Sequence, residues 1–451
     1  MRKFPISSTV TQFASYFTKR NFSLFIVGGC VRDWVLHRDI TDMDFATDAT
    51  PLEVTSLFYK VIPTGIDHGT VTVLFKGEQF EVTTFRSDDE YLDNRRPKSV
   101  SFIGSIEEDL KRRDFTMNAL AVNVISGELI DLHEGLIDIQ KRLIRAIGDP
   151  ETRFSEDALR MMRACRFAST LEFTIEENTL SAIKKLHSSL STISGERIHI
   201  ELFKILASRR PSIAFKIMDE CGILALLFPE LSIGKGVSQK GEHKADVLDH
   251  NLYALDNAPQ SDVLIRLSAL LHDIGKPVTK KIDEYGNVTF YDHEKASLKM
   301  AKELMLRIKC SNAEIHKVLH LIKHHMLHYT SDMSDAAIRR FIARVGIEHI
   351  DDLFALRIAD GIATNGINKK EILVEFKKRI EKELLSQHAF SMKDLKVNGN
   401  DLIGIGIPKG PVIGLLLKEL FETVLDDPSN NEKEKLLTIA ERFYKLRVNL
   451  F

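Results

Sequence analysis

Two aspartates separated by one residue, Asp42 and Asp44, are the first candidates for chemistry in this sequence. The run Met43 to Ala46 predicts a short β-strand, and residues i and i+2 of a strand point to the same face. Paired carboxylates repel each other unless cations lie between them. Two Mg²⁺ ions held in this way would activate a hydroxyl group and stabilise a pyrophosphate leaving group. An isolated Asp-x-Asp is more often a solvated turn, so its context must decide.

Two glycines before this pair could form a binding surface for a phosphate group. Gly28 and Gly29 follow the apolar run Leu24 to Val27 and precede a predicted helix, so backbone without side chains can approach a triphosphate. Further β-type runs at Thr70 to Phe75 and Gln79 to Phe85, with a helical stretch from Ile106, predict a small α+β domain. From about residue 152 onward, apolar residues recur at helical spacing and predict successive helices.

Asp157 and Arg160 are three residues apart, so on a helix they would share one face. A carboxylate accepts and a guanidinium donates, which matches a base edge that offers an amino donor beside a ring-nitrogen acceptor. Cytosine and adenine present that edge, whereas guanine and uracil present the reverse. The two side chains would therefore select CTP and ATP without a nucleic-acid template. The alternative is an ordinary ion pair on a helix surface.

Histidines form the second feature of chemical interest. Nine of the 16 fall between positions 243 and 328, where even spreading predicts about three, and such clustering indicates a metal site. The pair His272-Asp273 closes an apolar helical run. A single histidine on a helix is usually a core or surface residue, and we apply that interpretation to His316, His320 and His349.

The totals limit the class of protein. A length of 451 residues predicts three or four packed units, and 44% hydrophobic with 28% charged residues is typical of a globular chain. The four cysteines form no CxxC pair, and no run of 18 apolar residues or signal peptide is evident, so we predict a cytoplasmic protein without membrane spans. The net charge of -2 excludes a generally basic protein, although residues 141–166 carry a local charge of +3 from seven basic and four acidic residues.

Taken together, these motifs resemble the tRNA nucleotidyltransferases and bacterial poly(A) polymerases of the DNA polymerase beta superfamily, over nearly the whole chain. The resemblance implies that Asp42 and Asp44 bind catalytic Mg²⁺, with Glu81 as a third carboxylate. It also implies a set of nucleotide-binding residues, in which the arginines bind phosphate and Asp114 binds a ribose hydroxyl. This set comprises Gly28, Gly29, Arg32, Arg112, Arg113, Asp114, Asn118, Asp157, Arg160 and Arg163.

Three further segments resemble the CCA-adding members. Thr64 to Thr70, with Asp67 and His68, is similar to the CCA-type segment after the acid pair, and Ser87 to Pro97 resembles the loop of enzymes that add the final A. Ser194 to Arg197 is similar to the neck motif, which we interpret as a capped helix start with a structural role. The tail segments 396–403 and 407–414 are similar to the family's tail. They would serve either as a helix-packing unit or as turns whose backbone amides bind phosphate.

The histidine-rich part resembles the HD phosphohydrolases. The resemblance implies His250, His272, Asp273 and Asp360 as ligands for Mg²⁺, Mn²⁺, Ni²⁺ or Co²⁺, and His293, His324 and His325 as ligands for a second ion or for phosphate. It implies hydrolysis of 2′,3′-cyclic phosphates or phosphate monoesters at damaged tRNA ends. A bound metal would lower the pKa of water.

We therefore predict an α+β enzyme that adds CMP and AMP to tRNA. Its predicted parts are a nucleotidyltransferase head (1–140), a helical neck and body (141–240), an HD domain (241–365) and a helical tail (366–451). The alternatives are an enzyme that adds only A, a poly(A) polymerase, and an HD nucleotide phosphohydrolase with an RNA-binding head. The sequence leaves the oligomeric state open.

Overall fold

The computed structural model describes residues 4–40, 42–66, 69–88, 100–102, 104–239, 245–285, 287–364, 370–386 and 388–448. The predictions that concern Asp67, His68 and most of the loop 87–97 fall outside these residues. The chain divides into two compact units. One comprises residues 1–232 with 307–310, and the other comprises 233–306 with 311–451. The finer division into four domains stays a prediction.

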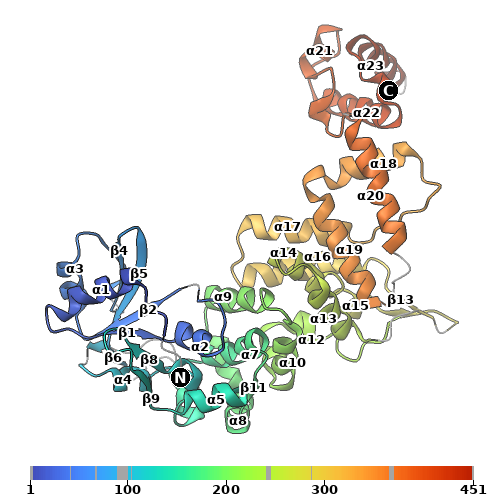
Figure 1. Cartoon of the computed structure of the whole chain (residues 1–451). Helices are drawn as coiled ribbons and strands as arrows, with labels where there is room; N and C mark the ends of the chain where they lie inside the picture. Colours follow the sequence, from blue (N-terminus) through green and yellow to red (C-terminus); the bar gives the residue numbers. More distant parts are fainter. Residues whose placement is uncertain are drawn as a thin grey trace. The chain divides into compact units, whose positions relative to one another are not determined.

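The first unit begins with a mixed α/β part and continues with helices (Figure 1). Its strands are β1 (Leu24–Val27), β2 (Asp44–Thr47), β3 (Val61–Gly65), β4 (Thr70–Phe75), β5 (Glu78–Thr84), β6 (Arg86–Asp88), β7 (Val100–Phe102), β8 (Leu120–Asn123), β9 (Leu129–Asp131), β10 (Leu143–Ile144) and β11 (Thr174–Ile175). Its helices are α1 (Ser8–Thr18), α2 (Gly29–Val35), α3 (Pro51–Leu57), α4 (Ile106–Lys111), α5 (Gly135–Lys141), α6 (Pro150–Glu156), α7 (Leu159–Leu171), α8 (Glu177–Leu186), α9 (Gly195–Leu206), α10 (Ser212–Glu220), α11 (Ile223–Leu227) and α12 (Pro229–Ser232).

A seven-stranded sheet in the order β3-β4-β5-β2-β1-β8-β9 is the framework of the head. The pairing of β2 with β5 is parallel, and the other pairings are antiparallel. Strand alternation separates two apolar faces. On one face, Phe13 of α1 packs on Phe45 and Phe80 at ring centroid distances of 5.6 and 4.6 Å. On the other, Phe25 and Val27 join the cluster that includes residues of α4.

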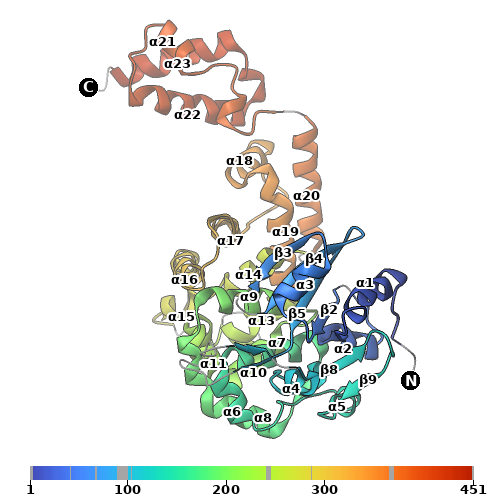
Figure 2. The same cartoon turned by 90° about the vertical axis from the view of Figure 1, so that its left-hand side faces the viewer.

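The second unit is almost entirely helical within its described residues. Its elements are α13 (Val247–Asn257), α14 (Val263–Leu271), α15 (Lys276–Thr279), β12 (Lys281–Ile282), β13 (Val288–Thr289), α16 (His293–Arg307), α17 (Asn312–His324), α18 (Asp335–Val345), α19 (Ile350–Thr364), α20 (Lys370–Leu385), α21 (Gly399–Gly404), α22 (Pro411–Asp426) and α23 (Lys433–Val448). In both views, α21, α22 and α23 lie side by side (Figures 1 and 2). Their buried apolar residues, among them Leu402, Leu416 and Leu436, form one cluster.

The predicted strands at 24–27 and 70–75 are confirmed, and those at 43–46 and 79–85 are each displaced by one residue. The expectation of helices alone after residue 152 is wrong in detail, because β11 and the β12–β13 hairpin interrupt them. The expected cap at Ser194 is also wrong: α9 begins at Gly195, but the Ser194 side chain makes no capping hydrogen bond. Within the described part of the chain, we find no helix with the length and apolar character that crossing a bilayer requires.

Candidate functional sites

Two carboxylates lie on adjacent central strands of the head. Asp44 opens β2 and Glu81 lies within β5, and these residues are register partners on parallel strands. Both side chains reach solvent, although neighbouring atoms displace part of the water around them. This desolvation raises the pKa of Asp44, Arg113 opposes the rise, and Asp42 adds to it. Desolvation and the charge of Asp44 raise the pKa of Glu81. The local charge therefore favours a cation.

Asp42 lies outside the strand that we expected to carry it. Because β2 begins at Asp44, strand alternation does not determine the direction of the Asp42 side chain. Its charge acts on Asp44, so the two carboxylates are neighbours. Asp42, Asp44 and Glu81 are nevertheless not among the described groups whose ligand atoms all lie within 4.8 Å of one another. Binding of one ion by all three requires side-chain rotation.

Gly28 and Gly29 expose backbone atoms beside two arginine side chains. Gly28 has a φ of 78°, which side chains rarely adopt, and a Cβ there would lie 3.0 Å from Nη1 of Arg113. A Cβ on Gly29 would lie 3.4 Å from Nη2 of Arg32. Both positions thus bring bare backbone and guanidinium groups to the same surface, as the sequence predicted for a phosphate site.

One pocket of about 550 Å³ brings most of the predicted head residues together. Its lining includes eight arginines and four carboxylates, so its charge suits a polyanionic ligand. Asp42 does not line it in the described part of the chain. The predicted residues in the lining are Gly28, Gly29, Arg32, Asp44, Glu81, Arg112, Arg113, Asp114, Asn118, Asp157, Arg160 and Arg163.

Asp114 is the buried centre of a hydrogen-bond network in this pocket. Its Oδ2 accepts from Nε and Nη2 of Arg163 at 2.8 and 2.6 Å. Its Oδ1 accepts from the Asn118 side chain at 3.0 Å, and Asn118 accepts from Arg32 at 2.6 Å. Burial alone would raise the pKa of Asp114, but Arg163 and Asn118 lower it to about 2. The carboxylate therefore positions two pocket arginines, directly or through Asn118.

The expected shared helix face of Asp157 and Arg160 is wrong. Asp157 follows α6 with a φ of −146° and a ψ of 104°, and α7 begins at Leu159. The Asp157 Oδ1 accepts from the Leu159 amide at 3.1 Å, which favours a break between the helices. The alternative of an ion pair between Asp157 and Arg160 is also wrong, because Asp157 pairs with Arg197 at 2.7 Å and Arg160 pairs with Glu156. Both side chains nevertheless line the pocket.

Four further residues, for which the sequence analysis predicts no role in this pocket, also line it: Arg86, Arg166, Phe167 and Arg197. Arg166 lies 4.1 Å from the Phe167 ring centroid and 2.6 Å from a Glu201 oxygen. Arg160, Arg163 and Arg166 of the basic segment 141–166 therefore line this pocket. Only the neck motif at 194–197 offered a signal for Arg197, and we had interpreted it as structural.

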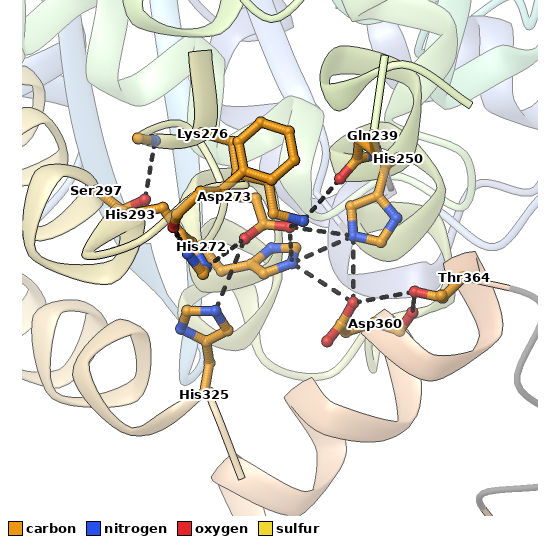
Figure 3. Close-up of polar contacts among 12 residues, drawn as sticks. Gln239, His250, His272, Asp273, Lys276, His293, Ser297, His325, Asp360 and Thr364 are labelled. Carbon is orange, nitrogen blue, oxygen red and sulfur yellow. Dashed lines mark hydrogen bonds and ion pairs between the residues drawn. The ribbon is translucent and has the colours of Figure 1, made fainter. Parts of the chain in front are cut away.

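The second candidate site is a buried centre in the second unit (Figure 3). Its ligand-type residues are each at most 9% exposed. They come from helices α13, α16 and α19 and from the residues that directly follow α14 and α17. The six residues are His250, His272, Asp273, His293, His325 and Asp360.

Asp273 separates the four imidazoles into two pairs. Its Oδ2 lies 3.2 Å from Nε2 of His272 and 3.5 Å from Nε2 of His250. Its Oδ1 lies 3.2 Å from Nε2 of His293 and 3.7 Å from Nε2 of His325. Each pair forms with Asp273 a group of ligand atoms within 4.8 Å of one another. The arrangement can hold two cations that share one carboxylate.

Asp360 completes the first of these groups. Its Oδ1 lies 3.2 Å from Nε2 of His250 and 3.6 Å from Nε2 of His272. Burial alone would lower the pKa of His272, but Asp273 and Asp360 raise it to about 10. The same attraction holds the pKa of both aspartates well below the ordinary value against the effect of burial.

Backbone carbonyls fix the orientation of three of the imidazoles. A carbonyl oxygen only accepts, so the Nδ1 atom carries the proton and Nε2 is left for a ligand, as in many metal sites. The Nδ1 to oxygen distances are 2.8 Å for His272 to Ala269, 2.9 Å for His293 to Phe290 and 2.6 Å for His325 to Ile322.

The donor set of this centre fits divalent cations. Oδ1 of Asp273, Nε2 of His293 and Nε2 of His325 are buried without a well-formed hydrogen bond. Imidazole with carboxylate suits first-row transition metals as well as Mg²⁺. Two cationic side chains of the protein balance the aspartates: Lys276 Nζ lies 2.5 Å from Oδ2 of Asp273, and Arg357 pairs with Asp360.

His324 does not join the centre that we predicted it to share with His325. Its ring lies 4.7 Å from that of His320, whose ring is 4.4 Å from that of His349. Desolvation and the charge of His320 lower the pKa of His324 to about 4. Consecutive residues of a helix face about 100° apart, so only one of the pair reaches the centre.

The head fold, its carboxylates and its arginine-rich pocket define a nucleotidyltransferase. Matches to family models support this class: "Poly A polymerase head domain" at residues 24–145, "Probable RNA and SrmB- binding site of polymerase A" at 172–233, and "tRNA nucleotidyltransferase domain 2 putative" at 288–440. The chain is 38% identical over 416 residues to the CCA-adding enzyme of Lactobacillus johnsonii, with 91% of each chain covered. It belongs to the family of CCA-adding enzymes.

Other relatives agree. The chain is 51% identical over 204 residues to the CCA-adding enzyme of Enterococcus faecalis, which covers 45% of this chain and 50% of that one. The fold is similar to the crystal structure of the Bacillus stearothermophilus CCA-adding enzyme in complex with CTP, with a TM-score of 0.74 and 28% identity over 99% of this chain and 100% of that one. The Thermotoga maritima CCA-adding enzyme complexed with tRNA shares the fold at a TM-score of 0.57 and 21% identity, with 96% of this chain and 94% of that one covered.

Proposed function

We propose that this protein adds CMP and AMP to the 3′ end of tRNA without a nucleic-acid template. One observation carries the proposal: a single pocket joins Asp44 and Glu81 to Asp157 and Arg160. The first two residues suit metal-assisted phosphoryl chemistry, and the last two suit recognition of a base. The free, buried cysteines fit the cytosol.

The reaction is a displacement at phosphorus. The 3′-hydroxyl of the RNA attacks the α-phosphorus of the nucleotide and loses its proton, the bond to the bridging oxygen breaks, and pyrophosphate leaves. Mg²⁺ bound by Asp42, Asp44 and Glu81 would neutralise the phosphates and lower the pKa of the hydroxyl. The raised pKa values of Asp44 and Glu81 fit such a cation. Arginines of the pocket, such as Arg113, bind the triphosphate.

Base selection rests on hydrogen-bonding positions that the described contacts leave on Asp157 and Arg160. Arg160 donates to the Arg153 carbonyl, the Arg112 carbonyl and Glu156, which uses three of its five N–H groups. Each Asp157 oxygen accepts one hydrogen bond and has a second lone pair. The remaining donors and acceptors match the edges of cytosine and adenine.

Three tRNA transcripts test the extent of addition. They end at the discriminator base, after the first C, and after CC, and each receives labelled CTP or ATP alone. We expect CMP on the first two and AMP on the third. AMP addition to the third transcript without any CMP addition would favour an A-adding enzyme, and long A tails would favour a poly(A) polymerase. Normal incorporation by Asp42→Ala, Asp44→Ala double variants would refute the assignment of the carboxylates.

We propose that the second centre is a phosphohydrolase, on the evidence of its paired histidine groups around Asp273. Divalent ions such as Mg²⁺, Mn²⁺, Ni²⁺ or Co²⁺ would supply an acidified water and neutralise the phosphate. Water adds to phosphorus, one P–O ester bond breaks, and the leaving oxygen takes a proton. His250, His272, Asp273 and Asp360 would hold one ion, and His293 with His325 and Asp273 a second.

This second activity has its own test. Purified protein is incubated with 2′,3′-cyclic AMP and each divalent ion, and the nucleoside monophosphate is measured. We expect His272→Ala to abolish hydrolysis and to retain CMP and AMP addition. Loss of both activities in a folded variant would contradict separate centres.

A further inference from the structure

A hairpin projects from the rim of the second centre. Residues 278–285 and 287–292, which we call the rim hairpin, contain the antiparallel pair β12–β13 with Lys281 opposite Thr289. Its two ends are fixed to the centre. Before it, the Gly275 amide donates to Ser297 at 2.9 Å, and a Cβ on Gly275 would lie 2.3 Å from the His293 carbonyl oxygen. Near its other end, the Phe290 carbonyl accepts from Nδ1 of His293.

Large apolar side chains on the rim hairpin are exposed. Val278, Ile282, Tyr285 and Tyr291 are 61, 67, 81 and 79% exposed. Single exposed apolar residues need no explanation, but four within one short segment favour an interaction. In the chain, Tyr291 lies between Phe290, whose carbonyl orients His293, and His293 itself, so the Tyr291 backbone lies at the edge of the centre and its ring is exposed.

The composition of the rim hairpin favours a nucleobase as its ligand. Tyrosine rings stack on bases of any identity, and lysines pair with the backbone phosphates of single strands. Lys280 and Lys281 lie in the hairpin beside the apolar residues, and the Lys276 Nζ atom lies 5.8 Å from the Phe290 ring centroid. A free phosphate ester without a base would leave both tyrosines without a role.

We propose that the rim hairpin selects RNA ends for the second centre by stacking the terminal base on Tyr291. This inference rests on the proposed phosphohydrolase function. The substrate class is a single-stranded RNA end with a 2′,3′-cyclic phosphate or a 3′-phosphate, and esters without a base are poor substrates.

Two substrates test the role of Tyr291: a short RNA with a terminal 2′,3′-cyclic phosphate, and glycerol 1,2-cyclic phosphate, which has no base. We expect Tyr291→Ala to lower kcat/KM for the RNA about ten-fold or more and for the glycerol ester less than two-fold. Tyr291→Phe, which keeps the ring, should match the wild type. Tyr59→Ala, which removes an exposed tyrosine of the head, is the matched control. Equal effects of Tyr291→Ala on both substrates would overturn the proposal.

A second readout separates this proposal from the function on which it rests. RNA with a terminal 4-thiouridine is crosslinked to the full chain, and the crosslinked peptide is identified by mass spectrometry. We expect a crosslink within 278–292 that Tyr291→Ala removes. A crosslink there without hydrolysis would support the base contact and refute the phosphohydrolase. Hydrolysis with crosslinks only elsewhere would refute the base contact alone.

Discussion

Replacement of Asp114 by Asn tests the network that positions the arginines of the head pocket. The side chain is 8% exposed, so the effect on its ionisation is little screened by solvent. Its pKa falls from the ordinary 3.8 to about 2, which corresponds to about 2.5 kcal/mol of folding free energy at about 1.36 kcal/mol per pKa unit. We expect Asp114→Asn to lower the free energy of unfolding by roughly 2 kcal/mol at pH 7. CMP incorporation should fall as well, because Arg163 loses the charged oxygen that accepts from its Nε and Nη2 atoms.

The single tryptophan provides the assay. Trp34 lies in α2 of the head, so its fluorescence during urea titration reports the unfolding of this unit. A depressed folded pKa stabilises above the unfolded pKa, so the difference from wild type should be full above about pH 4 and should shrink as the pH falls towards 2. Glu172→Gln is the control: its partner Arg209 is 82% exposed at 3.9 Å, so a change below about 0.5 kcal/mol is expected. Equal urea midpoints and slopes for Asp114→Asn and wild type would refute the reasoning.

Three further predictions concern the two centres. Arg197→Ala removes the ion pair between Arg197 and Asp157. In single-nucleotide assays we expect about ten-fold slower CMP addition and increased incorporation of UMP or GMP, whereas the control Arg209→Ala should be unaffected. Asp44→Asn should abolish nucleotide addition but raise the urea midpoint at pH 7. A raised pKa of Asp44 in the folded state means that its ionised form is destabilising, so the gain in stability should vanish below about pH 4. An unchanged urea midpoint would contradict the charge repulsion. Asp273→Asn should lower bound Mn²⁺ or Co²⁺ in elemental analysis after dialysis, whereas His324→Ala should retain it; equal metal content would exclude Asp273 as the shared ligand.

The sequence predicts four of the seven strands of the head sheet, β1, β2, β4 and β5, because these are β-type runs with clear ends, and it makes no prediction for β3, β8 and β9. Leu24 to Val27 is bounded by Ser23 and Gly28, and the structure starts and ends the strand at these positions. The helix break at Asp157 was missed because apolar periodicity is insensitive to one residue. The Asp157 carboxylate accepts a hydrogen bond from the Leu159 amide at the start of α7. An Asp before an apolar run is a known signal for the start of a helix, and this signal was present in the sequence.

The rest depended on contacts between distant parts of the chain. Arg197 meets Asp157 across 40 residues, and no local pattern indicates such a pairing. The choice between His324 and His325 depends on which way α17 is rotated about its axis. That rotation is set by the packing of Val318, Leu321 and Ile322, all of which are fully buried. The spacing of histidines in the sequence indicates the cluster, but it does not indicate how α17 is rotated about its axis.

The ion pairs of Lys276 and Arg357 bear on how the second centre would acquire the metal ions that we propose for it. Each supplies a positive charge to a buried aspartate of the second centre, so the polypeptide neutralises its own ligands. Folding of such a domain would not require a bound ion, unlike that of a zinc finger, whose core depends on metal. Ion loading then becomes a later, reversible exchange. If the second centre is the phosphohydrolase that we propose, its activity would follow the supply of divalent ions and not the rate of protein synthesis.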